Sequence, residues 1–305
     1  MTNKKEEYNK TLKSADTEEF IDIYFYRPIG YQWALLARRL GVTPNPITIA
    51  SIFIGIAAGI LFYYQDLTLN IVGMLLLMLA NSFDSADGQL ARMTNNKTKI
   101  GRILDGLAGN IWFIVIYVAL AIRTTQQGFF DWDLAWLWII SSVAGASHII
   151  HAAMADYYRN IHLYFLEFGK GGEFDQAKQV NEELKSVSWK KNIIKKIMLW
   201  FYRNYTNQQE MLTPKFQKFI AKVRILYPSH DLPTALCSEF RAKSKPLMKY
   251  TNILQFNTRV IALFICLFIG QPFFYFFFDL IILNGIMFYM ISRHEKMSKK
   301  LMTTI

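Results

Sequence analysis

Three aspartates in this sequence have the spacing of a divalent-cation site. Asp84 and Asp87 end one long apolar stretch, and Asp105 follows the start of the next. At about 100° per residue, Asp84 and Asp87 share one helical face, and a turn between the two stretches lets Asp105 converge on the same point. A carboxylate at the end of a membrane span is costly unless it is paired or binds a metal. Oxygen ligands without His or Cys suit Mg²⁺ or Mn²⁺ rather than zinc or copper.

Small and basic residues surround these acids. Gly88, Ala91 and Gly101 have almost no side chain, so a nucleotide could approach the backbone there, although ordinary packing of small residues between helices explains them as well. Arg92 and Arg102 could neutralise phosphates. They could equally meet lipid head groups as anchors at the membrane end.

The composition indicates the elements that must position these residues. The 305-residue chain is 52% hydrophobic, yet it carries a net charge of +11. Lys and Arg are segregated from long apolar stretches, which excludes a soluble nucleic-acid-binding protein and favours a membrane protein. Six stretches approach the roughly 20 apolar residues that cross a bilayer. The sequence therefore predicts an all-α polytopic membrane protein with spans at Ile47–Tyr64, Leu69–Phe83 continuing to Met93, Ile103–Ile122, Trp132–Ala155, Ile253–Gly270 and Pro272–Ile291.

The segment before the first span, Phe20–Leu40, is typical of an amphipathic helix lying in the membrane interface. It follows a polar arm, residues 1–19, that lacks the apolar core of a cleavable signal peptide. Loops poor in Lys and Arg alternate with basic segments, and the positive-inside rule then places both termini and the acidic cluster in the cytoplasm. We expect a protein of the cell inner membrane with a cytoplasmic active site.

A long insertion, residues 160–250, separates spans one to four (residues 20–159) from spans five and six (residues 251–305). Within it, apolar residues recur at helical spacing between basic ones. The pattern fits a basic amphipathic helix on the anionic inner leaflet, and it fits equally a helix packed on its neighbours in a small cytosolic subdomain. The residues concerned are Trp189, Ile193, Ile194, Ile197, Met198, Trp200 and Phe201, with Lys190, Lys191, Lys195, Lys196 and Arg203.

The stretch from residue 84 to residue 109 resembles the signature of the CDP-alcohol phosphotransferases, D-x2-D-G-x2-A-R-x8-G-x3-D-x3-D. It agrees at seven of eight fixed positions, and the eighth, an aspartate in the family, is Gly109. A match of this spacing across a span, a turn and a second span is improbable by chance. The identities are Asp84, Asp87, Gly88, Ala91, Arg92, Gly101 and Asp105.

The resemblance implies six spans and a cytosol-facing enzyme in which an alcohol attacks a CDP-linked donor, such as CDP-diacylglycerol, and releases CMP. It implies a homodimer and two divalent ions, Mg²⁺ or Mn²⁺. The family's last acid is the group that deprotonates the acceptor, and glycine cannot do so. The roles implied here are metal ligands for Asp84, Asp87 and Asp105, and contacts to the CDP moiety for Gly88, Ala91, Arg92 and Gly101.

Two histidines of the fourth span are candidates for a replacement base. His148 and His151 lie about 60° apart on a helix, with Arg159 on the same side. The alternative is that both histidines only form hydrogen bonds between helices. Asn257 and Arg259, near the start of the fifth span, are further candidates for the wall of a substrate pocket, as is Arg102.

Three functions compete at this point. The first is a phosphotransferase of phospholipid or sphingolipid head-group synthesis. The second is a catalytically impaired relative that binds lipid or nucleotide as a membrane scaffold, which the glycine at position 109 favours. The third, a transporter, is disfavoured because no pair of broken helices recurs in matching halves.

Overall fold

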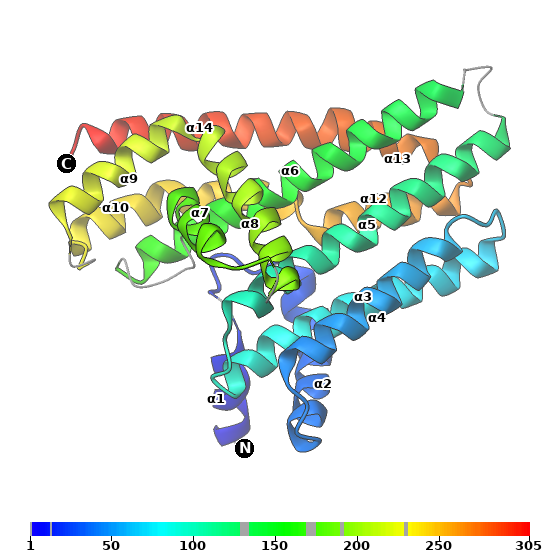
Figure 1. Ribbon diagram of the computed structural model, residues 1–305, viewed down its shortest axis with the longest axis horizontal. Helices are drawn as coiled ribbons and strands as arrows, with labels where there is room; N and C mark the ends of the chain where they lie inside the picture. Colours follow the sequence, from blue (N-terminus) through cyan, green and yellow to red (C-terminus); the bar gives the residue numbers. More distant parts are fainter. Residues whose placement is uncertain (1, 13, 129–133, 169–174, 190–191, 229–230) are drawn as a thin grey trace. The chain divides into compact units, whose positions relative to one another are not determined.

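The computed structural model describes residues 2–12, 14–128, 134–168, 175–189, 192–228 and 231–305 (Figure 1). Within these ranges helices are the only regular structure, which confirms the all-α class. Six of the described segments are long and apolar enough to cross a membrane: Pro44–Leu61, Leu67–Met93, Lys99–Gln127, Ala135–Leu166, Thr234–Phe268 and Phe273–Met302. Each overlaps one of the six predicted spans, although the ends differ, and together they confirm a polytopic membrane protein. Trp132, where the fourth predicted span begins, lies outside the described residues.

The chain divides into two compact units, Met1–His148 with Val260–Leu280, and Ile149–Arg259 with Ile281–Ile305. The first unit holds α1 (Thr2–Thr11), η1 (Asp22–Tyr26), α2 (Arg27–Arg39), α3 (Pro44–Leu61), α4 (Leu67–Met93), α5 (Lys99–Gln127) and α13 (Phe273–Phe277). The second holds α7 (Ala177–Ser186), α8 (Ile193–Met211), α9 (Pro214–Leu226), α10 (Thr234–Ser244), η2 (Lys245–Leu247), α11 (Met248–Ile253) and α14 (Asn284–Met302). Three helices continue from one unit into the other: α6 (Leu134–Leu166), α12 (Phe256–Phe268) and η3 (Phe278–Leu283).

Local sequence signals set the ends of the helices that carry the signature. Asp66 caps α4 by accepting a hydrogen bond from the backbone N–H of Leu69 at 2.9 Å, and Thr98 caps α5 by accepting one from Gly101 at 3.0 Å. Gly128 ends α5 in the left-handed conformation, with φ of 61°. Pro44 occupies the first turn of α3, where its missing N–H costs nothing.

Helix α3 packs along both α4 and α5 in the first unit. Its approach to α5 is close because α3 carries glycines on that side. A Cβ atom built on Gly55 would overlap the ring of Trp112, and one on Gly59 would lie 2.9 Å from Cγ1 of Val115. Small residues that allow close helix contact are typical of membrane helix pairs.

The predicted interfacial segment is helical, as η1 followed by α2. Helix α2 packs on α4, the helix that carries the first part of the family signature. The contact is a small apolar cluster of Ala34 and Ala37 from α2, Ala86 and Leu90 from α4, and Ile47 from α3. That the segment lies in the membrane interface stays a prediction, in keeping with the exposed side chains of Phe20 and Tyr24.

In the second unit, α9 lies along α14 and is joined to it by a buried carboxylate. Glu295 of α14 accepts hydrogen bonds from the backbone N–H groups of Lys215 at 2.7 Å and Phe216 at 3.0 Å. These donors have no partner within their own helix, because they belong to its first turn. Tyr158 of α6 stacks on His294 of α14 with ring centroids 3.8 Å apart, which adds to the core of this unit.

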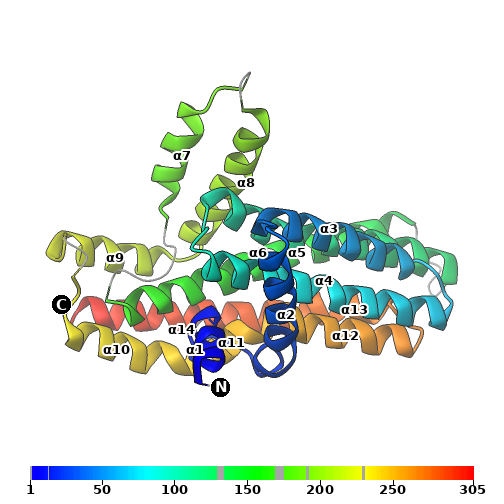
Figure 2. The same ribbon diagram turned by 90° about the horizontal axis from the view of Figure 1, so that it is seen from below.

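The segment between the fourth and fifth predicted spans is largely helical where it is described. Helix α6 continues past the predicted end of its span at Ala155 and stops at Leu166. Ahead of the fifth span the chain is helical from Thr234, and Pro246 falls in the short 3₁₀ turn η2. Helices α7 and α8 form a hairpin that projects from the unit (Figure 2). Lys190 and Lys191, assigned above to a basic amphipathic helix, lie outside the described residues.

Candidate metal centre

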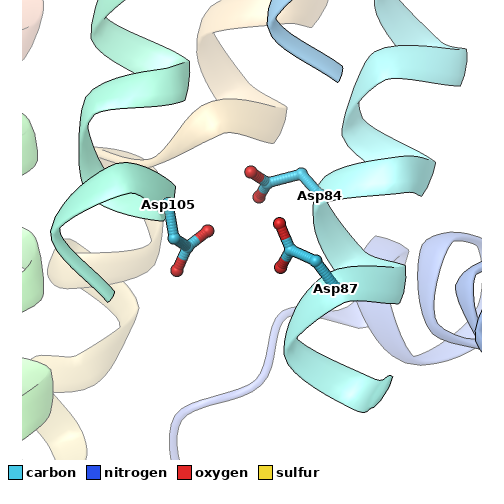
Figure 3. A group of neighbouring side chains, drawn as sticks. All are labelled: Asp84, Asp87 and Asp105. Carbon is cyan, nitrogen blue, oxygen red and sulfur yellow. The ribbon is translucent and has the colours of Figure 1, made fainter. Parts of the chain in front are cut away.

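The three signature aspartates face one another across the gap between α4 and α5 (Figure 3). One carboxylate oxygen from each of Asp84, Asp87 and Asp105 lies within 4.8 Å of the other two. Asp87 is buried, Asp84 is half-buried and Asp105 is exposed. The cluster therefore combines a fixed interior ligand with an opening to the outside.

The turn between α4 and α5 brings Asp105 back to the end of α4. Thr94 ends α4, and Asn95 takes the left-handed conformation with φ of 51°, which Asn tolerates better than most residues. The backbone N–H of Asn96 bonds to the carbonyl of Ala91 at 3.0 Å, and Thr98 then starts α5. The connection is short, so the first turns of α5 stay near the end of α4.

Thr48 of α3 holds the most buried of the three acids. Its hydroxyl donates a short hydrogen bond to Oδ2 of Asp87. A hydrogen bond to an ionised acceptor is stronger than one between neutral groups, so the Thr48 hydroxyl fixes this carboxylate in place. Sequence reasoning missed Thr48, although a polar residue inside the first span was a signal.

The cluster fits a divalent cation. Ligands of one Mg²⁺ lie at about 2.0–2.1 Å from the ion, so opposite ligands are about 4 Å apart, and paired ions stand about 3.5–4 Å apart. The observed separation of 4.8 Å or less leaves room for either arrangement with small side-chain shifts. The donors in the cluster are all carboxylate oxygens, as hard cations prefer.

The other signature residues lie around the acids on the same two helices. Nη1 of Arg92 lies 3.4 Å from the position of a Cβ on Gly88, so the guanidinium extends over the glycine backbone. A Cβ on Gly101 would lie 2.9 Å from Oδ1 of Asn45, which brings the start of α3 against the start of α5. Ala91 and Arg102 are half-buried on α4 and α5.

Arg92 is held by the N-terminal arm. Its Nε donates to the backbone carbonyl of Thr11 at 2.5 Å. One turn earlier on α4, Nε2 of Gln89 donates to the Thr11 hydroxyl at 3.1 Å and to the carbonyl of Arg27 at 3.2 Å. The end of the signature helix is therefore tied to both α1 and α2.

Arg27, the first residue of α2, also joins α4 to the segment that precedes η1. It bonds to Glu18 at 3.1 Å, in a pair that is largely shielded from solvent, and to the hydroxyl of Ser85 on α4 at 3.2 Å. Ser85 stands between the two aspartates of α4. Neither Thr11 nor Arg27 could be found from sequence periodicity, because these contacts join segments far apart in the chain.

Gly109 lies on α5 with no atom in the space its side chain would occupy. A Cβ built there meets nothing within 4 Å. Asp105, Gly109 and Phe113 follow one another at intervals of four residues, so they share one side of α5. The ring of His148 lies 4.2 Å from that of Phe113 and 5.9 Å from that of Tyr117, four residues further along.

The second predicted histidine has a different environment in the second unit. His151 is fully buried; its Nδ1 lies 2.6 Å from Nη2 of Arg259, and its Nε2 lies 3.0 Å from Oδ1 of Asn284. Because arginine only donates, Nδ1 must be the acceptor, and Nε2 carries the proton that is donated to Asn284. Both nitrogens of this neutral ring are thus engaged.

The remaining predicted residues of the second unit are also packed. Arg259 is almost completely buried and also donates to the carbonyl of Leu254 at 3.2 Å, and Asn257 is buried nearby in sequence. Arg159 donates to Oε1 of Gln255. The structure therefore brings Arg259 together with His151, and Arg159 with Gln255.

Comparison with known proteins agrees with this geometry. Residues 41–164 match the family model of the CDP-alcohol phosphatidyltransferases. An archaetidylinositol phosphate synthase of Pyrococcus horikoshii is 32% identical over 103 residues, which cover 34% of this chain and 51% of the relative. An uncharacterised protein of Aquifex aeolicus is 32% identical over 90 residues, 30% of this chain and 44% of the relative. The chain thus spans about half the length of the curated relatives it matches.

Proposed function

We propose that this protein is a membrane phosphotransferase that moves a substituted phosphate from a CDP-linked lipid to an alcohol. The observation that carries the proposal is the meeting of Asp84, Asp87 and Asp105 within 4.8 Å on the two helices of the family signature. The acceptor oxygen forms a new bond to the lipid-bearing phosphorus, the bond from that phosphorus to the bridging oxygen breaks, and CMP leaves. The acceptor hydroxyl gives up its proton.

The three aspartates would hold Mg²⁺ or Mn²⁺, with Asp87 as the fixed ligand because Thr48 orients it. A divalent cation bound there would neutralise charge on the diphosphate and on the departing CMP. We assign Gly88, Ala91 and Gly101 to the CDP moiety from the family signature. Arg92 extends over Gly88, where it can meet a phosphate, whereas Asn45 and Thr98 fill the side-chain space of Gly101.

We propose His148 as the group that accepts the acceptor's proton. Gly109 supplies no base, but the His148 ring packs on Phe113, one turn beyond Gly109 on the same side of α5. His151 is the weaker candidate, since both of its nitrogens are engaged by Arg259 and Asn284. We assign Arg102, Arg159, Asn257 and Arg259 to substrate binding on their charge and hydrogen-bonding capacity.

The donor is proposed to be CDP-diacylglycerol or a similar CDP-linked lipid. The named relative from Pyrococcus horikoshii is an archaetidylinositol phosphate synthase, so its product carries an inositol phosphate head group. Inositol phosphates are therefore the first acceptors to test, with ceramide and other alcohols beside them. From the family resemblance we further propose a homodimer. From the distribution of Lys and Arg we propose that it lies in the cell inner membrane with both termini and the metal centre in the cytoplasm.

The test is CMP release by the purified full-length protein in lipid nanodiscs. The donor is CDP-diacylglycerol labelled in the cytidine, offered with Mg²⁺ or Mn²⁺ and a panel of alcohols. We expect release that depends on the acceptor and stops with a chelator or with Asp84→Asn. The control is Asp66→Asn at the opposite end of α4, where Asn still caps the helix.

A scaffold that only binds is the competing function, and the missing acid at position 109 favours it. Calorimetry with CDP and Mg²⁺ separates the two. Metal-dependent CDP binding without CMP release for any acceptor would establish the scaffold. Absence of both CDP binding and turnover would reject both functions.

A further inference from the structure

The α7–α8 hairpin has buried apolar residues on the sides where its two helices face each other. Val180 and Leu184 of α7 are buried, as are Met198 and Leu199 of α8. The two helices contact each other along their length. These residues form the small core of the hairpin, as the packed-helix interpretation of the sequence requires.

The opposite side of α8 is apolar and exposed. At about 100° per residue, five exposed large apolar side chains in its first three turns fall within an arc of about 120° on the side away from the buried Met198 and Leu199, and the exposed Met211 in the last turn falls in the same arc. Ile194 is 71% exposed, Ile193 is 56% exposed and Phe201 is 48% exposed. A contiguous apolar strip of this kind marks a surface that meets another apolar medium. Its members are Ile193, Ile194, Ile197, Trp200 and Phe201.

The two outward faces of the hairpin differ sharply. On α7, the residue that points farthest from the buried side is the exposed Glu182, with the exposed Lys178 and Lys185 beside it on one flank and Gln179 and Ser186 on the other. The face of α7 is therefore suited to water. Of the two outward faces, only that of α8 is suited to an apolar environment. The two sides of the hairpin are therefore suited to different surroundings, water beside α7 and an apolar phase beside α8.

The charge on α8 is positive. It carries Lys195, Lys196 and Arg203, and its acid, Glu210, comes at its last turn. Nζ of Lys196 lies 5.0 Å from the ring centroid of Trp189, at the end of the hairpin next to Lys190 and Lys191 in the sequence. Trp side chains beside Lys are typical of the interface between lipid head groups and hydrocarbon.

The base of α8 is fixed to a membrane-spanning helix. Nε2 of Gln209 donates to the carbonyl of Ala153 at 2.8 Å, and the Tyr205 hydroxyl donates to Asp156 at 3.2 Å. Both partners lie in α6, at the end of the span predicted from the sequence. Helix α8 runs steeply across α6, with α7 on the side nearer the C-terminal end of α6 (Figures 1 and 2). If the bilayer ends near the predicted end of the span at Ala155, a helix that crosses α6 there would run along the membrane surface, with α8 nearer the bilayer than α7.

We propose that the α7–α8 hairpin lies on an anionic phospholipid surface, with the apolar strip of α8 in the interface and α7 toward water. The strip supplies apolar contact, and Lys196 and Arg203 supply attraction to acidic head groups, whereas Lys195 pairs with Glu183 of α7 at 3.7 Å. The occupant of this surface is the bilayer that holds the protein.

Spin labels on the full-length protein test the proposal. One label is placed at Ile194→Cys, in the strip, and the matched control at Glu182→Cys, on the opposite side of the hairpin. Both native cysteines are buried, and the parent protein measures their background labelling. Collision rates with oxygen, which enters lipid, and with a nickel chelate, which stays in water, are compared in nanodiscs with and without anionic lipid.

In anionic nanodiscs we expect the Ile194→Cys label to collide mainly with oxygen and the Glu182→Cys label mainly with nickel. Replacing the anionic lipid by phosphatidylcholine should lower lipid contact at position 194, by roughly fivefold for each basic residue near the surface. Equal nickel access at both positions in anionic nanodiscs would overturn the proposal. Protection of position 194 from both reagents would also overturn it, because it indicates a second copy or another protein on the strip. Neither result bears on CMP release, so the proposed enzyme is tested separately.

Discussion

The Nε of Arg92 donates a hydrogen bond to the backbone carbonyl of Thr11 at 2.5 Å. Arg92 is a signature residue, whereas Thr11 lies before the region that matches the family, residues 41–164. The arginine proposed to meet a phosphate is therefore oriented by a segment that the family match does not include.

Deletion of residues 1–12 should weaken CDP binding without unfolding the protein. Arg92 and Gln89 both lose their partner on the arm, while α3, α4 and α5 keep their mutual packing. A hydrogen bond to a charged group contributes about 1.5–3 kcal/mol, so we expect the Kd for CDP to rise roughly tenfold or more. Calorimetry in the presence of Mg²⁺ measures it.

The control for the deletion is Glu7→Gln, which breaks only the exposed ion pair with Arg38 and leaves Thr11 in place. Exposed pairs contribute little, so CDP affinity should stay near that of the unaltered protein. If the deleted protein binds CDP as tightly as the full chain, the arm does not orient Arg92.

Thr48→Val should destabilise the protein most when no divalent cation is present. The substitution keeps the shape of the side chain but removes the hydroxyl that donates to buried Asp87. Loss of a partner for a buried polar group costs about 1–3 kcal/mol, and a cation bound to Asp87 would offset part of it. Thermal unfolding with chelator and with Mg²⁺ measures the difference, with exposed Thr68→Val as control. Equal destabilisation under both conditions would argue against cation binding at Asp87.

Gly109→Asp should leave the rate of CMP release near that of the unaltered protein, because His148 is the proposed base. A rise of about 10²-fold or more would mean that the missing acid limits the reaction. The new side chain has room, since a Cβ at this position meets nothing within 4 Å. Gly106→Asp is the matched control, because it adds the same charge to α5 at another position with open space. A similar rate for both variants and the unaltered protein would mean that another group already serves as base.

The two histidines should respond differently to substitution. His148→Ala should lower turnover by about 10²-fold or more, the usual effect of losing a general base, and leave CDP affinity unchanged. His151→Ala should lower the melting temperature, because buried Arg259 loses the acceptor at 2.6 Å. Turnover at saturating substrate, CDP affinity and thermal unfolding are measured on both proteins. The reverse pattern would transfer the role of base to His151.

The sequence predicted the six spans and the aspartate cluster because both depend on local patterns. Hydropathy over about 20 residues marks a span, and spacing along two helices joined by a short turn brings Asp84, Asp87 and Asp105 together. The spacing alone was enough to predict that these three aspartates meet, and their ligand atoms do lie within 4.8 Å of one another.

The groups that hold these acids could not be predicted in the same way. Thr48 reaches Asp87, and Thr11 reaches Arg92, through tertiary packing between segments far apart in the chain. The ends of the spans were also inexact. Helix α6 extends to Leu166 because residues beyond Ala155, such as Phe165, are buried against other helices of the second unit, which hydropathy does not reveal.

The close packing of Gly55 of α3 against the Trp112 ring of α5 affects where Asp105 lies. Trp112 follows Asp105 by two helical turns, and its ring fills the space above Gly55, so it limits how far α5 can rotate or slide against α3. A larger residue at position 55 would push α5 outward and carry Asp105 away from α4. If the cluster binds a cation as proposed, its affinity should depend on position 55, on a third helix. A screen for variants that lose the proposed activity should then recover substitutions at Gly55.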